Sequence, residues 1–375
     1  MKKLFIIAVV ALFASAACSK IETVRPDQKI NFSVANYMNQ TRAQGNKFED
    51  EFSSFTTNAW YYPTATTNAP QHYMENVVIT KQTGNDTPSA YWGPAEPYYW
   101  PKTGTINFFS YASKNTVTVD AGDSAYGQSF AISGFTPVAD DNIVIADAVY
   151  NAGLNVNADG SMVTDDLATG TTDSGFNGVP TMFRHLLSQV TFTIGLATTT
   201  PTVGTTNYSA TIKSFTVKSA ANTGSLSLTA GASSGTALNV QPWTPAADGT
   251  KVGWTASATA DLAFTAPTAA LTLAAGQTTG NVETVVENRT VLPQALADAV
   301  VLEIVYDLQT KHGNTVYASE ENVKVTAQLN TLSVKNWCMN QRIIYNVTIN
   351  PVTGLVMFDP AVAAWTTATA VAVTL

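Results

Sequence analysis

Few residues in the sequence have both the type and the spacing that catalysis requires. The segment Gly231–Gly235 (GASSG) has the G-x-S-x-G spacing of a nucleophile elbow, in which a serine lies between a strand and a helix and a histidine follows. Small residues surround this segment, and only His312 lies downstream. His72, His185 and His312 form no HExxH motif and no zinc-ligand spacing with cysteine. The sequence therefore predicts no enzyme, no metal centre and no cofactor.

One acidic loop has part of the spacing of a calcium-binding loop. In the segment NVNADGSMVTDD, positions 1, 3, 5 and 12 of an EF-hand-like loop are Asn155, Asn157, Asp159 and Asp166. Position 1 is asparagine instead of aspartate, and position 12 is aspartate instead of the bidentate glutamate. No flanking helices are apparent. A solvated turn is the favoured interpretation, and calcium is the alternative.

Cys18 follows a segment with the features of an export signal. Two lysines precede an apolar run at 4–14, which has the length of a secretory signal and is too short to span a bilayer. The residues before Cys18 resemble the lipobox of bacterial lipoproteins, although Ser15 stands where a leucine-like residue is usual. We expect a signal peptide at 1–17 and an acyl chain such as palmitate on Cys18, which would leave Cys338 without a disulfide partner. The alternative is an ordinary signal-peptidase cut.

Composition and charge exclude one class of partner. Only 12% of residues are charged, about half of the roughly 25% in average globular proteins. The formal net charge is -8, and no lysine or arginine stripe is present, so nucleic acid is not expected to bind. The low charge and the abundance of threonine, alanine and valine are typical of an extracellular β-protein.

Alternation of apolar and polar residues dominates the chain and predicts an all-β fold. The segment KINFSV places Ile30, Phe32 and Val34 on one face of a strand. Turn clusters such as TGND, AGDS and KHGNT separate many similar segments, and long amphipathic helices are absent. This pattern favours sandwich or barrel architecture. The threonine-, proline- and glycine-rich stretch 197–207 is the best candidate for a domain boundary.

The carboxyl end of the chain is apolar and strand-forming. Val371, Val373 and Leu375 alternate along TTATAVAVTL, which contains no charged residue. Such an end is poorly suited to a free monomer in water, because unpaired apolar strands associate with other chains. The alternative is that this end pairs within its own domain.

Aromatic residues gather in WYYP at 60–63 and in YWGPAEPYYWP at 91–101. Rings of this kind stack on sugars, but they also bury large areas in a fold without disulfides. Packing in the core is the favoured interpretation. A sugar-binding surface is the alternative.

An ordered set of motifs resembles the fimbrillin family of Bacteroidetes-type lipoprotein pilins. The likeness runs from Cys18 to Trp365 and depends on the order of the motifs, since no single motif is decisive. The motifs are KINFSV with QTRA, YYWPKTGTINFFSYA, NIVIADA, TMFRHLLSQVTFTI, TVLPQ and NWCMNQRIIYNVTINPVTGLVMFDPAVAAW.

The resemblance implies two tandem transthyretin-like Greek-key β-sandwich domains in a fimbrial subunit or adhesin. It also implies export as an outer-membrane lipoprotein, after which a trypsin-like protease removes the first strand and a strand from another subunit replaces it. By this resemblance Arg42 is the leading cleavage position, and the alternative is that it is a solvated loop residue. Ile30, Phe32 and Val34 then belong to the displaced strand. The expected segments are 18–42 as a pro-segment, 43–200 and 201–375 as domains, and 366–375 as a donor strand.

The expected function is therefore that of a structural subunit or accessory adhesin of a surface fimbria. Its expected partners are other fimbrial subunits, the outer membrane through the lipid anchor, and a host protein or glycan. The plugs of the donated strand would be Val371, Val373 and Leu375. The alternative is a surface lipoprotein that never polymerises and binds glycans or host ligands.

Overall fold

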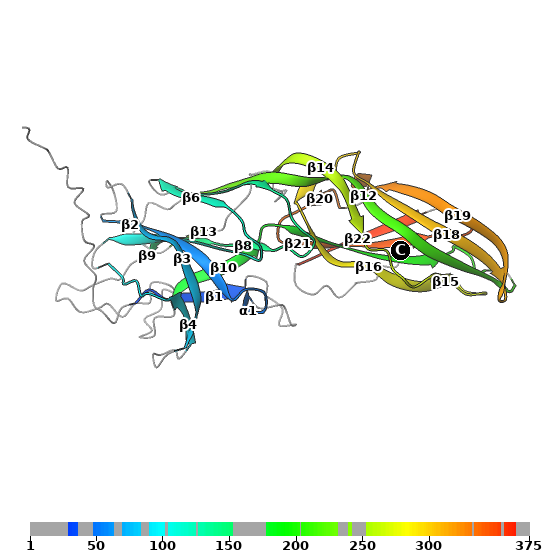
Figure 1. Ribbon diagram of the computed structural model, residues 1–375, viewed down its shortest axis with the longest axis horizontal. Helices are drawn as coiled ribbons and strands as arrows, with labels where there is room; N and C mark the ends of the chain where they lie inside the picture. Colours follow the sequence, from blue (N-terminus) through cyan, green and yellow to red (C-terminus); the bar gives the residue numbers. More distant parts are fainter. Residues whose placement is uncertain are drawn as a thin grey trace, which may run out of the picture.

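The computed structural model describes residues 29–36, 48–63, 70–83, 90–101, 104–124, 127–152, 178–202, 204–231, 239–241, 253–331, 334–353 and 356–364. These residues form an elongated all-β structure in which the amino-terminal strands gather at one end and the carboxyl-terminal strands at the other (Figure 1). The all-β class predicted from the alternating pattern is confirmed. The described residues contain no helix that is long and apolar enough to cross a membrane.

The amino-terminal end contains a nine-stranded sheet with the order β13-β9-β5-β2-β3-β4-β1-β10-β8. Its strands are β1 Phe32–Asn36, β2 Ser54–Tyr62, β3 Gln71–Thr83, β4 Ala90–Pro94, β5 Thr105–Ser113, β8 Ile143–Ala146, β9 Ala148–Ala152, β10 Val179–His185 and β13 Asn239–Gln241. One short helix, α1 (Phe48–Glu51), follows β1 in the sequence. Because β5 also pairs with β8, seven of these strands form a closed ring, in the order β5-β2-β3-β4-β1-β10-β8.

Two further sheets contain most of the carboxyl-terminal strands, and β6 of the second sheet lies toward the amino-terminal end (Figure 1). One has the order β16-β11-β21-β22, and the other has the order β19-β18-β12-β7-β6, with β14 and β15 also paired to β12. Their strands are β6 Val119–Ser124, β7 Gly127–Phe135, β11 Ser188–Ala197, β12 Thr206–Gly231, β14 Trp254–Phe264, β15 Leu271–Leu273, β16 Thr279–Val291, β18 Val301–His312, β19 Thr315–Gln328, β21 Gln341–Ile349 and β22 Val356–Ala364. The remaining elements are β17 Gln294–Ala295, which pairs with β20 Asn336–Trp337, and a 3-10 turn at Leu329–Thr331.

Three apolar clusters hold the structure together. The amino-terminal cluster includes Phe32 and Phe108, and the carboxyl-terminal cluster includes Phe192. A third cluster lies between them and contains residues from both halves of the chain, among them Phe130 and Trp254. Burial of large aromatic side chains is a main stabilising contribution in these clusters.

Strands from both sides of residue 200 share sheets. β11 lies before this position and pairs with β16 and β21, and β7 pairs with β12. The nine-stranded sheet likewise contains β13 from the later side, so a dividing line at 200 passes through three sheets that contain strands from both sides of it. The two-domain division and the transthyretin-like Greek-key detail stay predictions.

Candidate functional site

The first strand fills a position between two other strands of the closed ring. β1 pairs in parallel with β10 from Phe32 opposite Val179 to Asn36 opposite Phe183. On its other side β1 meets β4 in antiparallel fashion, through Phe32 and Trp92 only. We call the space between β4 and β10 that β1 occupies the β1 slot. Without β1 the ring would be open, and both neighbouring strands would present unpaired backbone groups.

Backbone contacts fix the beginning of β1 in this slot. The N–H of Ile30 donates to the carbonyl of Tyr98 at 2.8 Å, and the N–H of Val179 donates to the carbonyl of Asn31 at 2.8 Å. Lys29 forms an isolated antiparallel bridge with Tyr99. The strand is therefore in register before its regular pairing with β10 begins.

The side chains of β1 enter the amino-terminal core. Ile30 is 1% exposed and Phe32 is 2% exposed, and Val34 packs partly buried against the same cluster. The ring of Phe32 meets the rings of Phe55 and Phe108 edge-on, with centroids 5.5 and 5.7 Å away. The alternation of Ile30, Phe32 and Val34 thus places all three against one core.

Helix α1 closes one wall of the slot through contacts of its own. Phe48 stacks on Phe183 of β10 with centroids 4.4 Å apart, and it meets Trp92 of β4 edge-on at 5.5 Å. Glu49 forms an ion pair with Lys81 of β3 at 2.7 Å. Both side chains are nearly half exposed, so the ion pair contributes little, and Phe48 is the stronger anchor. The chain after the predicted cut is therefore attached independently of β1.

The wall formed by β10 is held to its neighbour by a charge pair. The guanidinium of Arg184 donates to both carboxylate oxygens of Asp147, at 2.7 and 3.0 Å. The side chain of Asp147 is 3% exposed, so breaking the pair would leave a buried charge uncompensated. The N–H of Asp147 also donates to the carbonyl of Met182 at 3.0 Å. These contacts keep β10 in place beside β8 and β9.

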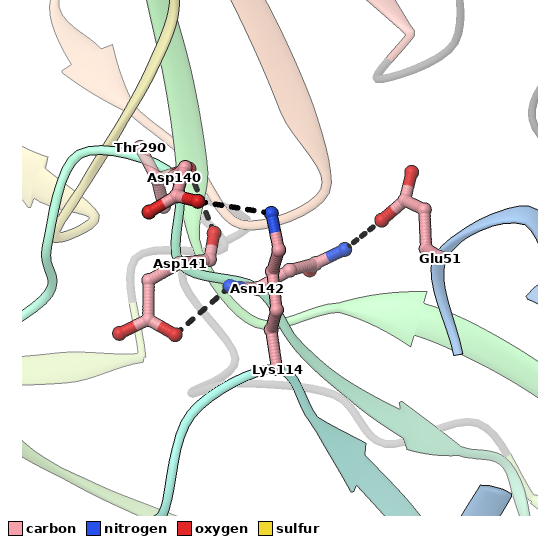
Figure 2. A network of polar contacts seen from close by, with 6 residues as sticks. All are labelled: Glu51, Lys114, Asp140, Asp141, Asn142 and Thr290. Carbon is pink, nitrogen blue, oxygen red and sulfur yellow. Dashed lines mark hydrogen bonds and ion pairs between the residues drawn. The ribbon is translucent and has the colours of Figure 1, made fainter. Parts of the chain in front are cut away.

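A polar network joins this wall to the other end of the molecule. Figure 2 shows Asn142 donating through its side chain to Glu51 of α1, while the carbonyl of Asp141 accepts a hydrogen bond of 2.8 Å from the hydroxyl of Thr290 in β16. The other side-chain atom of Asn142, Oδ1, lies 2.8 Å from Nδ1 of His185. No sequence motif pointed to Asn142, because its contacts come from distant positions.

His185 is a partly buried residue whose imidazole is neutral. Burial lowers its pKa to about 3 from the ordinary value of 6.5, so the imidazole carries no charge at neutral pH. It lies at the end of β10, and its backbone N–H donates to Oδ1 of Asn340 at 3.1 Å. The arrangement fits a structural role at the junction of the two halves.

Acid is expected to destabilise the fold through His185. Below pH 6.5 His185 becomes protonated in the unfolded chain, whereas in the folded chain it stays neutral down to about pH 3. The free energy of unfolding therefore falls by up to about 1.4 kcal/mol for each pH unit of acidification. Chemical denaturation at several values between pH 6.5 and 5 avoids most carboxylate titration. The dependence of the free energy of unfolding on pH should become weaker in His185→Gln. It should be unchanged in His72→Gln, a substitution at an exposed position. Equal slopes in all three proteins would contradict this assignment.

The aromatic stretches contribute mainly to packing. Among the described residues of these stretches, five are no more than 7% exposed, namely Trp60, Tyr61, Tyr62, Trp92 and Trp100. The exposed ring of His72 stacks on Trp60 with centroids 4.9 Å apart and an interplanar angle of 3°. The burial matches the packing interpretation and leaves little of these rings available to a sugar.

Several predicted site residues lie outside the described residues. They are Cys18, Arg42, Asn155, Asn157, Asp159, Asp166, Val371, Val373 and Leu375. The same holds for Ser233 of the GASSG segment. Among the residues that the structure describes, no group of three or more histidine, cysteine, aspartate or glutamate side chains is placed to hold a metal ion.

Comparisons with known proteins agree on one family and fold. A model of the fimbrillin-like family matches residues 41–365. No curated protein sequence matches the chain. A solved fimbrial protein from Bacteroides vulgatus has a TM-score of 0.56 at 13% identity, covering 90% of this chain and 100% of that one.

Two other solved structures match with lower scores. A candidate cell adhesion protein from Bacteroides uniformis has a TM-score of 0.40 at 15% identity, covering 91% of this chain and 99% of that one. The tip fimbrial protein Mfa3 from Porphyromonas gingivalis, with a carboxyl-terminal truncation, has a TM-score of 0.33 at 10% identity, covering 85% of this chain and 96% of that one.

Proposed function

The chain belongs to the fimbrillin-like family, and we propose that it is a subunit or accessory adhesin of a surface fimbria that assembles by strand exchange. In this proposal, acylation of Cys18 anchors the exported chain at the outer membrane. A trypsin-like protease then cuts after Arg42 and releases β1. A strand from the carboxyl end of a second copy fills the vacated β1 slot. No enzymatic activity is proposed.

One observation carries the proposal: β1 is a separable member of a closed ring of strands. β1 lies before Arg42 in the sequence, and α1 lies after it. Phe48 of α1 packs on β4 and β10 through its own ring contacts. A cut between these elements would therefore detach the strand and leave both walls of the slot standing.

Leaving the β1 slot empty is unfavourable in free energy. Fully burying one large apolar side chain is worth about 1.5–3 kcal/mol, and Ile30 and Phe32 are both almost completely buried. Two such side chains give roughly 3–6 kcal/mol, to which the backbone hydrogen bonds of the strand add. An empty slot would expose this apolar surface together with unpaired strand edges, so it would favour a replacement strand.

The carboxyl end of another copy is the replacement that the sequence supports best. Val371, Val373 and Leu375 alternate in the same way as the three apolar residues of β1. The structure describes the chain up to the end of β22 at Ala364, which pairs with Gln341. The tail that follows is long enough to supply one strand.

Cleavage by an arginine-specific protease tests the proposal directly, because trypsin would also cut after Lys47. The purified mature chain is expected to be cut after Arg42 and then to form ladders that resist SDS. Arg42→Ala should keep β1 and stay monomeric, whereas Arg25→Ala, at a site that the following Pro26 protects, should behave like the natural chain. A chain that is cut cleanly and stays monomeric would contradict strand exchange. An unchanged monomer that binds polysaccharide would support the alternative of a glycan-binding lipoprotein.

A further inference from the structure

We propose that the side chain of Asn340 is the end stop of the β1 slot. It limits how far along β10 a strand from a second copy of this chain can pair, and so it sets the register of that strand. The inference rests on the proposed strand exchange. It adds to that proposal the length of the partner strand and the residue that ends it.

The backbone of β10 presents its hydrogen-bonding groups to two different neighbours. The N–H of Val179 donates to Asn31 at 2.8 Å and therefore faces the slot. Backbone groups of successive residues in a strand point to opposite edges, so every second N–H up to that of His185 also faces the slot. The next N–H, from Leu186, donates to Ile143 at 2.9 Å on the opposite side.

The described part of β1 pairs with β10 up to Asn36 and Phe183, one hydrogen-bonding position before His185. In a parallel ladder the N–H of His185 would bond to a carbonyl of the next part of β1. It donates instead to Oδ1 of Asn340 at 3.1 Å. A side-chain oxygen therefore occupies the place that the carbonyl of a longer strand would need.

Asn340 and its neighbours are held by contacts with Leu187 and with Ser188 at the start of β11. Its N–H donates to the carbonyl of Leu187 at 3.2 Å, and the hydroxyl of Ser188 donates to the carbonyl of Cys338 at 2.6 Å. The following residue, Gln341, pairs with Ser188 at the start of the parallel register between β11 and β21. The φ angle of Asn340 is 60°, a left-handed value that asparagine tolerates better than most residues. The stop is thus part of a fixed turn.

The other end of the slot is also narrow. A Cβ atom at Gly178 would lie 2.8 Å from the carbonyl carbon of Phe32 and 2.9 Å from the carbonyl oxygen of Asn31, so backbone passes closely over backbone there. The φ angle of Gly178 is 88°, which favours glycine. Between this point and Asn340 the slot holds β1, Phe32–Asn36.

The proposed occupant has a matching pattern of side chains. Val371, Val373 and Leu375 lie at alternate positions, as Ile30, Phe32 and Val34 do. A strand that continued along β10 past Phe183 would have to displace Asn340.

Peptide binding to the cut chain tests the stop. A site-specific protease sequence is placed between residues 37 and 47, the chain is cut, and binding of labelled peptide 29–36 is compared with that of the same peptide extended by two alanines at its carboxyl end. With the natural chain the extension should change affinity by less than about 2-fold. In Asn340→Gly the freed N–H of His185 should bond to the added residues, and affinity should rise about 3- to 10-fold. Glycine retains the left-handed backbone at this position.

Two controls separate the stop from general effects of substitution. Asn340→Asp keeps an oxygen acceptor and should behave like the natural chain. Asn322→Gly is a matched change, because Asn322 also has a left-handed φ, of 55°, and lies on β19, away from the slot. If the two added alanines raised the affinity of the peptide for the natural chain as much as for Asn340→Gly, the role of Asn340 would be contradicted. The proposed strand exchange would be unaffected by that result. Failure of peptide 29–36 itself to bind would overturn both.

Discussion

Replacing Phe32 by alanine is expected to destabilise the uncut chain and to leave the assembled fimbria unchanged. Phe32 is 2% exposed and meets two other rings, and truncation of a buried phenylalanine to alanine typically costs about 3–5 kcal/mol. The loss applies only while β1 occupies its own slot. Once the strand is removed, the substitution is no longer present in the particle. Chemical denaturation of the uncut monomer and thermal dissociation of multimers in SDS measure the two effects.

Phe192→Ala is the matched control for this prediction. Phe192 is fully buried in the carboxyl-terminal cluster, where it packs against Phe215, Phe264 and Tyr345. It stays in the chain after cleavage, so its substitution should weaken both the monomer and the multimer. If Phe32→Ala lowered the dissociation temperature of multimers as much as Phe192→Ala does, β1 would still be present in the assembled particle.

Local sequence patterns were sufficient to predict the all-β class and the buried face of the first strand. The alternation in KINFSV placed Ile30 and Phe32 on one face, and both are buried. The interpretation of the aromatic stretches as packing elements agrees with the low exposure of Trp60 and Trp100. Periodicity reports which side of a strand is apolar, because it follows from backbone geometry alone.

Strand partners were beyond the reach of the same patterns. β1 pairs in parallel with β10, so Phe32 lies opposite Val179, far away in the sequence. The stretch around Pro201 was predicted as a boundary and does lie between β11 and β12, yet composition could not indicate that β11 would join β16 and β21. Turn residues report where a strand ends. Sheet membership depends on long-range packing.

The residues at the end of the slot had no local signal. Asn340 and Asn142 both act on His185, and they do so from positions far apart in the chain. An asparagine in a short turn is common, because it tolerates left-handed backbone. Its role as a hydrogen-bond acceptor for another strand appears only when the two segments are brought together.

A variant that can only donate its tail and a variant that can only accept a tail are expected to form a dimer and nothing longer when they are mixed. Arg42→Ala keeps β1, so its slot stays filled and the copy can only donate its tail. A copy that lacks residues 370–375 and is cut after Arg42 can only accept a tail. Neither copy alone offers both a slot and a donor strand, so neither should grow. Size-exclusion chromatography with light scattering would distinguish the expected dimer from monomers and ladders.

The direction of the tail's side chains provides the matched control for this mixture. Val371→Asp with Val373→Asp places two charges where the slot is apolar, and a buried unpaired charge is costly enough to stop dimer formation. Ala370→Asp with Ala372→Asp places the same charges on the opposite face of the strand, and dimers should still form. Equal loss in both variants would mean that the tail does not enter the slot as a strand. If the shortened copy unfolds, the tail belongs to its own core, because a strand that is only lent to a neighbour contributes nothing to the stability of the monomer.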